Sequence, residues 1–350
     1  MTLPSHPSYI SSRMNLARGE RIDIGPKRGA RAVSASVLLL IFLNIFLGQG
    51  FAQEIRKVRM GYPALSLTFL SFFVAKDAGI FKKHGLDVEL IQMAGVVQTS
   101  ALVAGEIDYL TGITSPLVAA ARGLPLKGIM VTVRKPLFYV VSSPDIHRME
   151  DLAGKKLAVD RFGTLQHLVA RLLFKRKGIN PDLITYIQTE SVSNSVLALS
   201  QGSVHSALLS LPNNLTMIQK GFKELASADE LAIQFPSGGL GVQEAKLKKD
   251  PGQVKLVLRA MLDSVEFSEK EKTWVVHYVQ QKWRLNPKAA EDSYKVWISS
   301  LATDGKLSLK DLQEAFDVAY ANQQIPIPVQ AKTGMDYTLL DQALKERAKR

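Results

Sequence analysis

Apolar and polar positions follow two periods along the chain, and segments of the two kinds alternate. Residues 55–61 and 86–91 show the period of two that is typical of strands, whereas residues 68–78 carry apolar side chains at helical spacing. Glycines close most of these segments. The same rhythm returns further along, so we expect two similar α/β halves, 55–133 and 138–226, each with a parallel sheet covered by helices.

The period changes near residue 241. The glycine-rich segment 238–241 does not fit a strand that leads into a helix, and we interpret it as a flexible crossing between the halves. From Asp250 onward helical spacing dominates, and Ser308 is a suitable N-cap for one of the helices. The expected helices lie at 255–268, 272–283, 287–298 and 309–321.

The N-terminal region has the pattern of an export signal. Residues 32–53 carry no charge, follow a basic polar stretch, and contain the small-residue site Gly50-Phe51-Ala52. We therefore expect residues 1–52 to be a cleaved signal peptide and the remainder to be periplasmic. The alternative is a retained membrane anchor, because the apolar run approaches the length that spans a bilayer.

The amino-acid composition limits the kinds of site that the chain can form. The 350 residues have a formal net charge of +12 and include six histidines and no cysteine. The lack of cysteine excludes disulfides, thiolate metal sites and a catalytic thiol, and we expect no metal and no cofactor. The basic excess raises the local concentration of anions. We expect no nucleic-acid partner, because no basic block carries interleaved aromatic residues.

Several expected strands turn directly into helices through small or hydroxyl-bearing residues. The first N–H groups of a helix are unpaired and carry positive partial charge, and open α/β sheets bind ligands beyond the carboxyl ends of their strands. We therefore expect two facing rims of donors that suit a small anion or a carboxylate-bearing molecule. For any single hydroxyl the alternative is a plain N-cap. The clearest openings are 66–68, 114–116, 163–164 and 210–212.

Catalytic signals are weak, and we expect the chain not to be an enzyme. The motifs GxSxG, HExxH, GxGxxG and the Walker A loop are absent from the sequence. Asp160 and Arg161 follow an expected strand, where they either pair with each other or contact a ligand. Tyr62, Tyr139 and Phe162 either wall the pocket or pack in the core.

Four segments, in order, resemble the nitrate/sulfonate/taurine-type substrate-binding proteins of ABC transporters: 73–88, 101–109, 151–159 and 198–209. The resemblance extends over about 58–262. It implies an α/β, two-lobed periplasmic-binding-protein fold of type II, with two hinge crossings and a helical C-terminal region. Lobe one would comprise 54–135 plus 236–350, and lobe two would comprise 136–235.

The resemblance also implies a function. The chain would capture a small organic anion (sulfonate-, carboxylate- or pyrimidine-like) by hinge closure and deliver it, as a monomer, to an ABC permease in the cytoplasmic membrane. Arg134 and Arg161 are the candidates for contact with the anion. By matching position, the ligand loops of the family fall on Ser66, Leu67, Thr68, Gln98, Thr99, Thr114, Ser115, Phe162, Gly163, Thr164, Ser193, Asn194 and Ser210.

Two alternatives share this fold. One is a ligand-sensing exported subunit of a signalling system, which would use the same site with a different partner. The other is an enzyme similar to the thiamine-pyrimidine synthases, which resemble this chain in the opening of lobe one. Those synthases carry a Cys-rich iron-binding motif, and this sequence has no cysteine.

Overall fold

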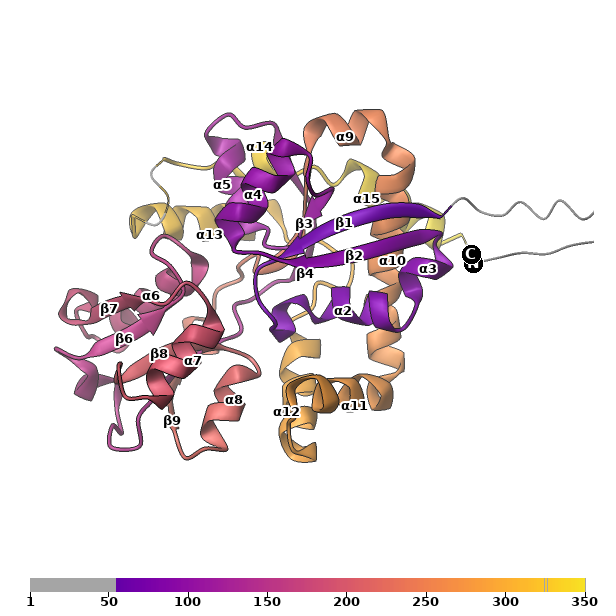
Figure 1. Ribbon diagram of the computed structural model, residues 1–350. Coiled ribbons are helices and arrows are strands. Elements are labelled where there is room, and N and C mark those ends of the chain that lie inside the picture. The colour runs from indigo at the N-terminus through magenta and orange to yellow at the C-terminus, as the bar shows by residue number, and fades with distance from the viewer. Residues whose placement is uncertain (1–54, 324, 326, 350) are drawn as a thin grey trace, which may run out of the picture. The chain divides into compact units, whose positions relative to one another are not determined.

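The strands form two five-stranded sheets (Figure 1). The computed structural model describes residues 55–323, 325 and 327–349. The expected signal peptide, residues 1–52, lies outside the described residues. Both sheets belong to one compact unit of the chain.

The first sheet has the order β2-β1-β3-β10-β4. β1 runs parallel to β2 and β3, whereas β10 is antiparallel to both β3 and β4. The expectation of a purely parallel sheet is therefore wrong. After the last strand of the second sheet, β9, the chain crosses back to the first sheet, and β10 joins it antiparallel to its neighbours. The strands are β1 (Arg56–Tyr62), β2 (Leu86–Gln92), β3 (Tyr109–Leu110), β4 (Leu126–Val133) and β10 (Gly238–Gln243).

The second sheet repeats the plan with the order β7-β6-β8-β5-β9. β6 is parallel to β7 and β8, and β5 is antiparallel to β8 and β9. The entering strand β5 thus occupies the place that β10 occupies in the first sheet. The strands are β5 (Phe138–Ser142), β6 (Lys156–Val159), β7 (Thr185–Gln188), β8 (Ser206–Ser210) and β9 (Lys223–Ser227).

Helices follow the strands of both sheets as the apolar spacing predicts. Gly79, at φ 73°, separates α2 from the short helix α3. In the first half the elements are η1 (Leu67–Phe69), α2 (Leu70–Asp77), α3 (Ile80–Lys83), α4 (Gly95–Ala104) and α5 (Thr114–Ala121). In the second half they are η2 (Met149–Leu152), α6 (Leu165–Arg176), η3 (Pro181–Leu183), α7 (Val192–Ser200), α8 (Asn213–Ile218) and η4 (Ala228–Leu231).

The C-terminal region is helical, and its longest helix, α10, packs against α2, α3 and α15 (Figure 1). Asp250 caps α10 by accepting the Gln253 N–H, and Ser308 caps α13 by accepting the Asp311 N–H, as expected for that serine. These elements are α9 (Glu244–Lys249), α10 (Pro251–Lys270), α11 (Lys272–Trp283), α12 (Pro287–Ser299), α13 (Leu309–Ala321), α14 (Ala331–Gly334) and α15 (Thr338–Arg347).

The glycine-rich segment 238–241 is not a flexible crossing. It begins β10, a buried strand between β3 and β4. A Cβ on Gly239 would lie 2.2 Å from the carbonyl oxygen of Met130, and one on Gly241 would lie 2.7 Å from Leu110. Glycine is needed here because neighbouring strands approach too closely for any side chain.

One apolar core runs through both halves. It includes Leu67 and Phe72 from the first half together with Leu209 and Leu211 from the second. A second cluster joins Leu168 of α6 to Phe316 of α13, so the C-terminal helices also contact the second half. Among the described residues, no helix is both long and apolar enough to cross a membrane.

Candidate functional site

The segments that follow β1 and β8 meet in one backbone hydrogen bond. The N–H of Leu67, the first residue of η1, donates to the carbonyl of Leu211, directly after β8, at 2.9 Å. Ser66 and Ser210 precede these two residues and are both buried. Two of the expected ligand loops, 66–68 and 210–212, are therefore in direct contact although they belong to different sheets.

Thr68 reaches the centre of the first sheet's carboxyl edge. A Cβ placed on Gly238 would lie 2.8 Å from the Thr68 carbonyl oxygen and 3.0 Å from the Thr132 hydroxyl. The N–H of the next residue, Gly239, donates to the carbonyl of Thr111. Strand β10 therefore brings the loop after β1 next to the ends of β3 and β4.

Three buried polar atoms at this edge have no hydrogen-bond partner: Gln98 Oε1, Thr111 Oγ1 and Thr132 Oγ1. Their residues are at most 1% exposed. Sequence reasoning placed Gln98 in the site but missed both threonines. Thr132 is the one hydroxyl-bearing residue in the apolar strand β4, a signal that could have singled it out.

Other expected residues of the first half are used locally. The Thr99 hydroxyl donates to the carbonyl of Gly95, one turn back in α4. The Thr114 hydroxyl donates to the carbonyl of Pro236 at 3.1 Å, which ties α5 to the segment that leads into β10. Ser115 was expected to be the N-cap of α5, and this is wrong: the helix begins at Thr114 and its N-cap is Ile113.

At the end of β6, Thr164 is the N-cap of α6. Its hydroxyl accepts the N–H of His167 and lies 2.7 Å from a carboxylate oxygen of Asp160. Gly163 adopts φ 77°, which lets the chain turn sharply into the helix. Burial raises the pKa of the Asp160 carboxyl above its ordinary value, although the Thr164 hydroxyl and the Arg161 N–H both donate to it.

The cationic side chains near the candidate loops already have partners. Arg161 forms an ion pair with Glu190 at 2.5 Å, so the expected pairing of its side chain with Asp160 is not what the structure shows. Arg134 donates to the carbonyl of Ser299 at 3.4 Å. Lys135 pairs with Asp229 at 2.8 Å. The charges of Arg161 and Lys135 are thus balanced by carboxylates, whereas the partner of Arg134 is an uncharged carbonyl and Arg161 Nε is buried without a partner.

Two exposed apolar side chains lie in the candidate loops or directly before them. Phe162 is 52% exposed, and its ring lies 5.1 Å from the ring of His167, which in turn meets Tyr186 edge to face. Leu65 on the first half is 38% exposed, and its carbonyl accepts the indole N–H of Trp283. Tyr139, by contrast, is buried in the core, and Tyr62 packs edge to face on Phe73.

Ser193 and Asn194 are exposed in the first turn of α7. The N-cap of that helix is Ser191, which accepts the Asn194 N–H, and the Asn194 side chain donates back to the carbonyl of Thr189 at 2.7 Å. Both hydrogen-bond partners of Asn194, Ser191 and Thr189, lie on the second half. The part of Ser193 and Asn194 in a site shared by both sheets stays a prediction.

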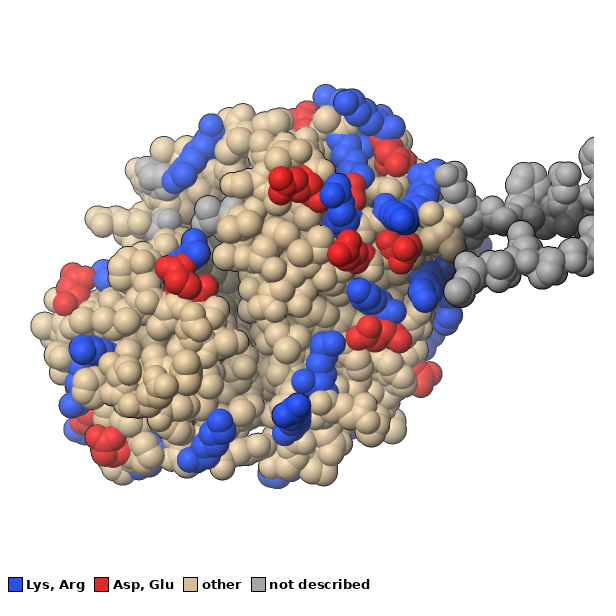
Figure 2. All heavy atoms as spheres, in the orientation of Figure 1, with Lys and Arg blue, Asp and Glu red and all other residues tan. Residues whose placement is uncertain are grey.

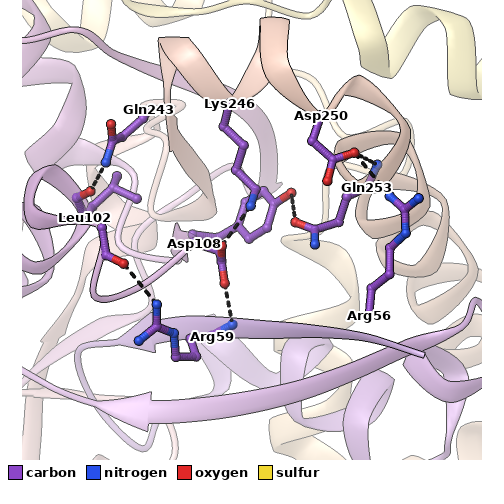
Figure 3. Close-up of polar contacts among 10 residues, drawn as sticks. Arg56, Arg59, Leu102, Asp108, Gln243, Lys246, Asp250 and Gln253 are labelled. Carbon is purple, nitrogen blue, oxygen red and sulfur yellow. Dashed lines mark hydrogen bonds and ion pairs between the residues drawn. The ribbon is translucent and has the colours of Figure 1, made fainter. Parts of the chain in front are cut away.

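A polar network holds the amino ends of the first sheet's strands (Figure 3). Asp108, just before β3, accepts Lys246 of α9 at 2.7 Å and the Arg59 N–H at 2.9 Å. Arg56 and Gln253 both donate to Asp250 at the start of α10. This network lies at the opposite ends of the strands from the candidate loops, and it anchors α9 and α10 to the sheet.

Neither a patch of one charge sign nor a metal-binding cluster marks the site in the part of the chain that the structure describes. On the face drawn in Figure 2, basic and acidic side chains are interspersed. Within the described ranges no group of three or more histidine and carboxylate side chains could hold a metal ion. What the strand ends do offer is neutral hydrogen bonding beside apolar surface.

These sheets and their crossings define the class of the molecule, the periplasmic-binding-protein fold. The chain belongs to the NMT1/THI5-like family, whose model matches residues 66–271. A solved structure with the same fold is the alkanesulfonate-binding protein SsuA from Xanthomonas axonopodis pv. citri, bound to MOPS. It is 20% identical with a TM-score of 0.69, and the match covers 81% of this chain and 99% of that one.

Curated relatives include both binding proteins and enzymes. A protein of Brucella abortus (strain 2308), named as a candidate binding protein, is 27% identical over 219 residues, 60% of this chain. The match spans 66% of that relative, just under two thirds of its length. The 4-amino-5-hydroxymethyl-2-methylpyrimidine phosphate synthase THI12 of Saccharomyces cerevisiae is 23% identical over 65% of this chain and 71% of its own.

Proposed function

We propose that this chain is an exported receptor that captures a small organic molecule between its two halves and passes it unaltered to an ABC importer. The observation that carries the proposal is the Leu67–Leu211 hydrogen bond, which brings strand-end loops of both sheets together inside the family-matched segment. Ligands of open α/β sheets bind at such ends.

The proposal includes the division of the chain. Lobe one comprises 54–135 plus 236–350 and lobe two 136–235, with the crossings before β5 and before β10. In support, the first set contains all five strands of one sheet and the second set all five of the other. Rotation about the two crossings would open and close the site.

The site is proposed to include Ser66, Thr68, Gln98, Thr164 and Ser210. Their positions at or beside strand ends support this, as does the Oε1 of Gln98, which is buried without a partner. The sequence predicts a sulfonate-, carboxylate- or pyrimidine-like anion as ligand. The relative SsuA is named for binding an alkanesulfonate, which is consistent with a receptor of this kind.

We further propose that the chain is not an enzyme, works as a monomer in the periplasm after loss of residues 1–52, and has an ABC permease as partner. The absence of cysteine supports a binding role, because no thiol is available as nucleophile or iron ligand. A sensor subunit would use the same ligand site with a signalling partner instead.

The test is a thermal-denaturation series on the full chain with sulfonates, carboxylates and pyrimidines. A ligand that binds only the folded state stabilises it by about 2.7 kcal/mol at a concentration 100 times its Kd. Trp283 offers a second signal, because its indole donates to the carbonyl of Leu65 beside Ser66. Compounds that raise the Tm should change the Trp283 emission, and a Trp283→Phe variant should lose that change.

If no compound in the series changes either the Tm or the emission, the receptor proposal is contradicted. If a compound binds and is recovered chemically changed after incubation with the purified chain, the chain is an enzyme.

A further inference from the structure

The carboxyl edge of the first sheet carries more hydrogen-bond capacity than the chain itself uses. Gln98 is 1% exposed, and its amide is fixed in orientation because Nε2 donates to the carbonyl of Met93 at 2.9 Å. The other end of the amide, Oε1, has no partner. An unpaired buried carbonyl costs about 1–3 kcal/mol, so this oxygen favours any occupant that can donate to it.

Contacts of Gln98 place this oxygen at the ends of two strands. Cβ atoms built on Gly61 and Gly112 would lie 3.0 Å from Gln98 Cγ and 3.9 Å from Gln98 Oε1, respectively. Gly61 lies near the end of β1, and Gly112 follows β3. The acceptor therefore lies over the edge from which the candidate loops 66–68 and 114–116 leave the sheet.

Two further unpaired groups extend along the same edge. Thr111 follows β3, and Thr132 is the penultimate residue of β4. Both are completely buried, and neither hydroxyl has a partner. A hydroxyl can donate or accept, whereas the amide oxygen of Gln98 can only accept. The Gln98 oxygen therefore needs a hydrogen-bond donor from the ligand, whereas the two hydroxyls can adapt to either a donor or an acceptor.

The charged groups in the candidate loops also disfavour an anionic ligand. A bare sulfonate or carboxylate brings oxygen atoms that only accept, and an acceptor facing Gln98 Oε1 would leave both atoms unsatisfied. Asp160, after β6, adds a carboxylate to the candidate loops of the second half. The Nε of Arg161 is buried without a partner, but the charge of its guanidinium is already balanced by Glu190.

We propose that Gln98, with Thr111 and Thr132, forms the acceptor side of the ligand site, so that the ligand is an uncharged molecule carrying an amide or amino N–H. This inference rests on the proposed receptor function and narrows it, since it excludes bare sulfonates and carboxylates. The exposed side chains of Leu65 and Phe162 suit an apolar or aromatic body on the same molecule.

Three probes with one shared ring separate the possibilities: benzamide, which has N–H donors; N,N-dimethylbenzamide, which has none; and benzenesulfonate, an anion that only accepts. Titration calorimetry of the full chain should show benzamide binding at least about tenfold more tightly than either of the others. Each tenfold difference corresponds to about 1.4 kcal/mol.

Variants identify the responsible atom. Gln98→Leu removes the acceptor and should weaken the binding of benzamide at least about tenfold. Thr111→Val and Thr132→Val should each give smaller losses. Ser71→Ala is the matched control, because Ser71 Oγ is also buried and unpaired but belongs to α2, and this variant should bind as the parent does. The Tm of every variant is measured to confirm folding.

The inference is overturned if benzenesulfonate binds as tightly as benzamide, if benzamide fails to bind, or if Gln98→Leu binds benzamide unchanged. If only ordered water binds Gln98, Thr111 and Thr132, benzamide would fail to bind. A sulfonate that binds and raises the Tm would overturn this inference while supporting the receptor. Failure of every compound in the broader series would overturn the receptor proposal itself.

Discussion

Gly239 shows how much of this fold depends on a single missing methyl group. A Cβ there would lie 2.2 Å from the Met130 carbonyl oxygen, a backbone atom that cannot move aside without displacing β4. We expect Gly239→Ala to lower the free energy of unfolding by about 2–3 kcal/mol, as is typical of overpacking in a core. Urea denaturation of the full chain measures the change.

Gly252 provides the matched control. It lies in the first turn of α10, and a Cβ there would meet no heavy atom closer than 3.7 Å. Alanine is the better helix former, so Gly252→Ala should leave stability unchanged or raise it by up to about 1 kcal/mol. Equal stability of the two variants would show that β10 is not packed as described.

Asp160 gives the chain a pH dependence of known sign. Because burial raises the pKa of its carboxyl, the folded state holds this proton more tightly than the unfolded chain does. The resulting stabilisation is complete below the ordinary pKa of an aspartic acid and is lost as the pH rises through the raised value. Asp160→Asn keeps an oxygen that can accept from Thr164 but cannot ionise.

We therefore expect the stability of the parent chain, relative to Asp160→Asn, to fall as the pH rises from about 3.5 to 7. Denaturation curves of both proteins at several pH values test this. A difference between the two proteins that is constant with pH, or that changes in the opposite direction, would contradict the raised pKa.

At this scale the sequence predicted residue types better than residue roles. Thr164 was expected at a helix opening and caps α6, but Ser115 was expected as a cap and lies inside α5. Both residue types carry a hydroxyl, and only the path of the backbone decides which residue occupies the N-cap position. Thr132 was missed although it is the one hydroxyl-bearing residue of an apolar strand, and its position beside Gly238 of β10 is set only by the fold.

Among the helical elements, two serines at N-cap positions differ in what they do. Ser308 accepts the Asp311 N–H at the start of α13, whereas Ser66 occupies the N-cap of η1 without a side-chain capping bond. We expect Ser308→Ala to cost about 1 kcal/mol of stability and to leave ligand binding unchanged. Ser66→Ala should change stability little and weaken binding.

Thermal unfolding and titration with a compound found in the ligand series measure the two effects. If Ser66→Ala destabilised the chain as much as Ser308→Ala and left binding unchanged, Ser66 would be structural and not part of the site.

Whole elements were predicted well where the apolar spacing was long. The expected helix at 272–283 coincides with α11, and the one at 309–321 coincides with α13. The prediction for 238–241 failed because it depended on other segments. β10 contains three glycines whose small size serves close strand packing and not flexibility. A local pattern carries no information about that kind of contact.

For the molecule as a whole, the alternation of strands and helices predicted two α/β halves, and the ordered resemblance predicted the fold. The strand directions were not predictable locally, because β5 and β10 each enter their sheet directly from the other half of the chain. The meeting of Leu67 with Leu211 is likewise a property of the folded chain, since 144 residues of sequence separate loops that share a hydrogen bond.

The central claim is that the two halves hold a small molecule without changing it. Native mass spectrometry of the full chain, purified without denaturation from its own cells, tests this most directly. We predict a 1:1 complex whose ligand is released intact on denaturation and rebinds to the refolded chain. A chain that carries no small molecule and takes none up from an extract of those cells, or one that releases a chemically altered compound, would contradict the account.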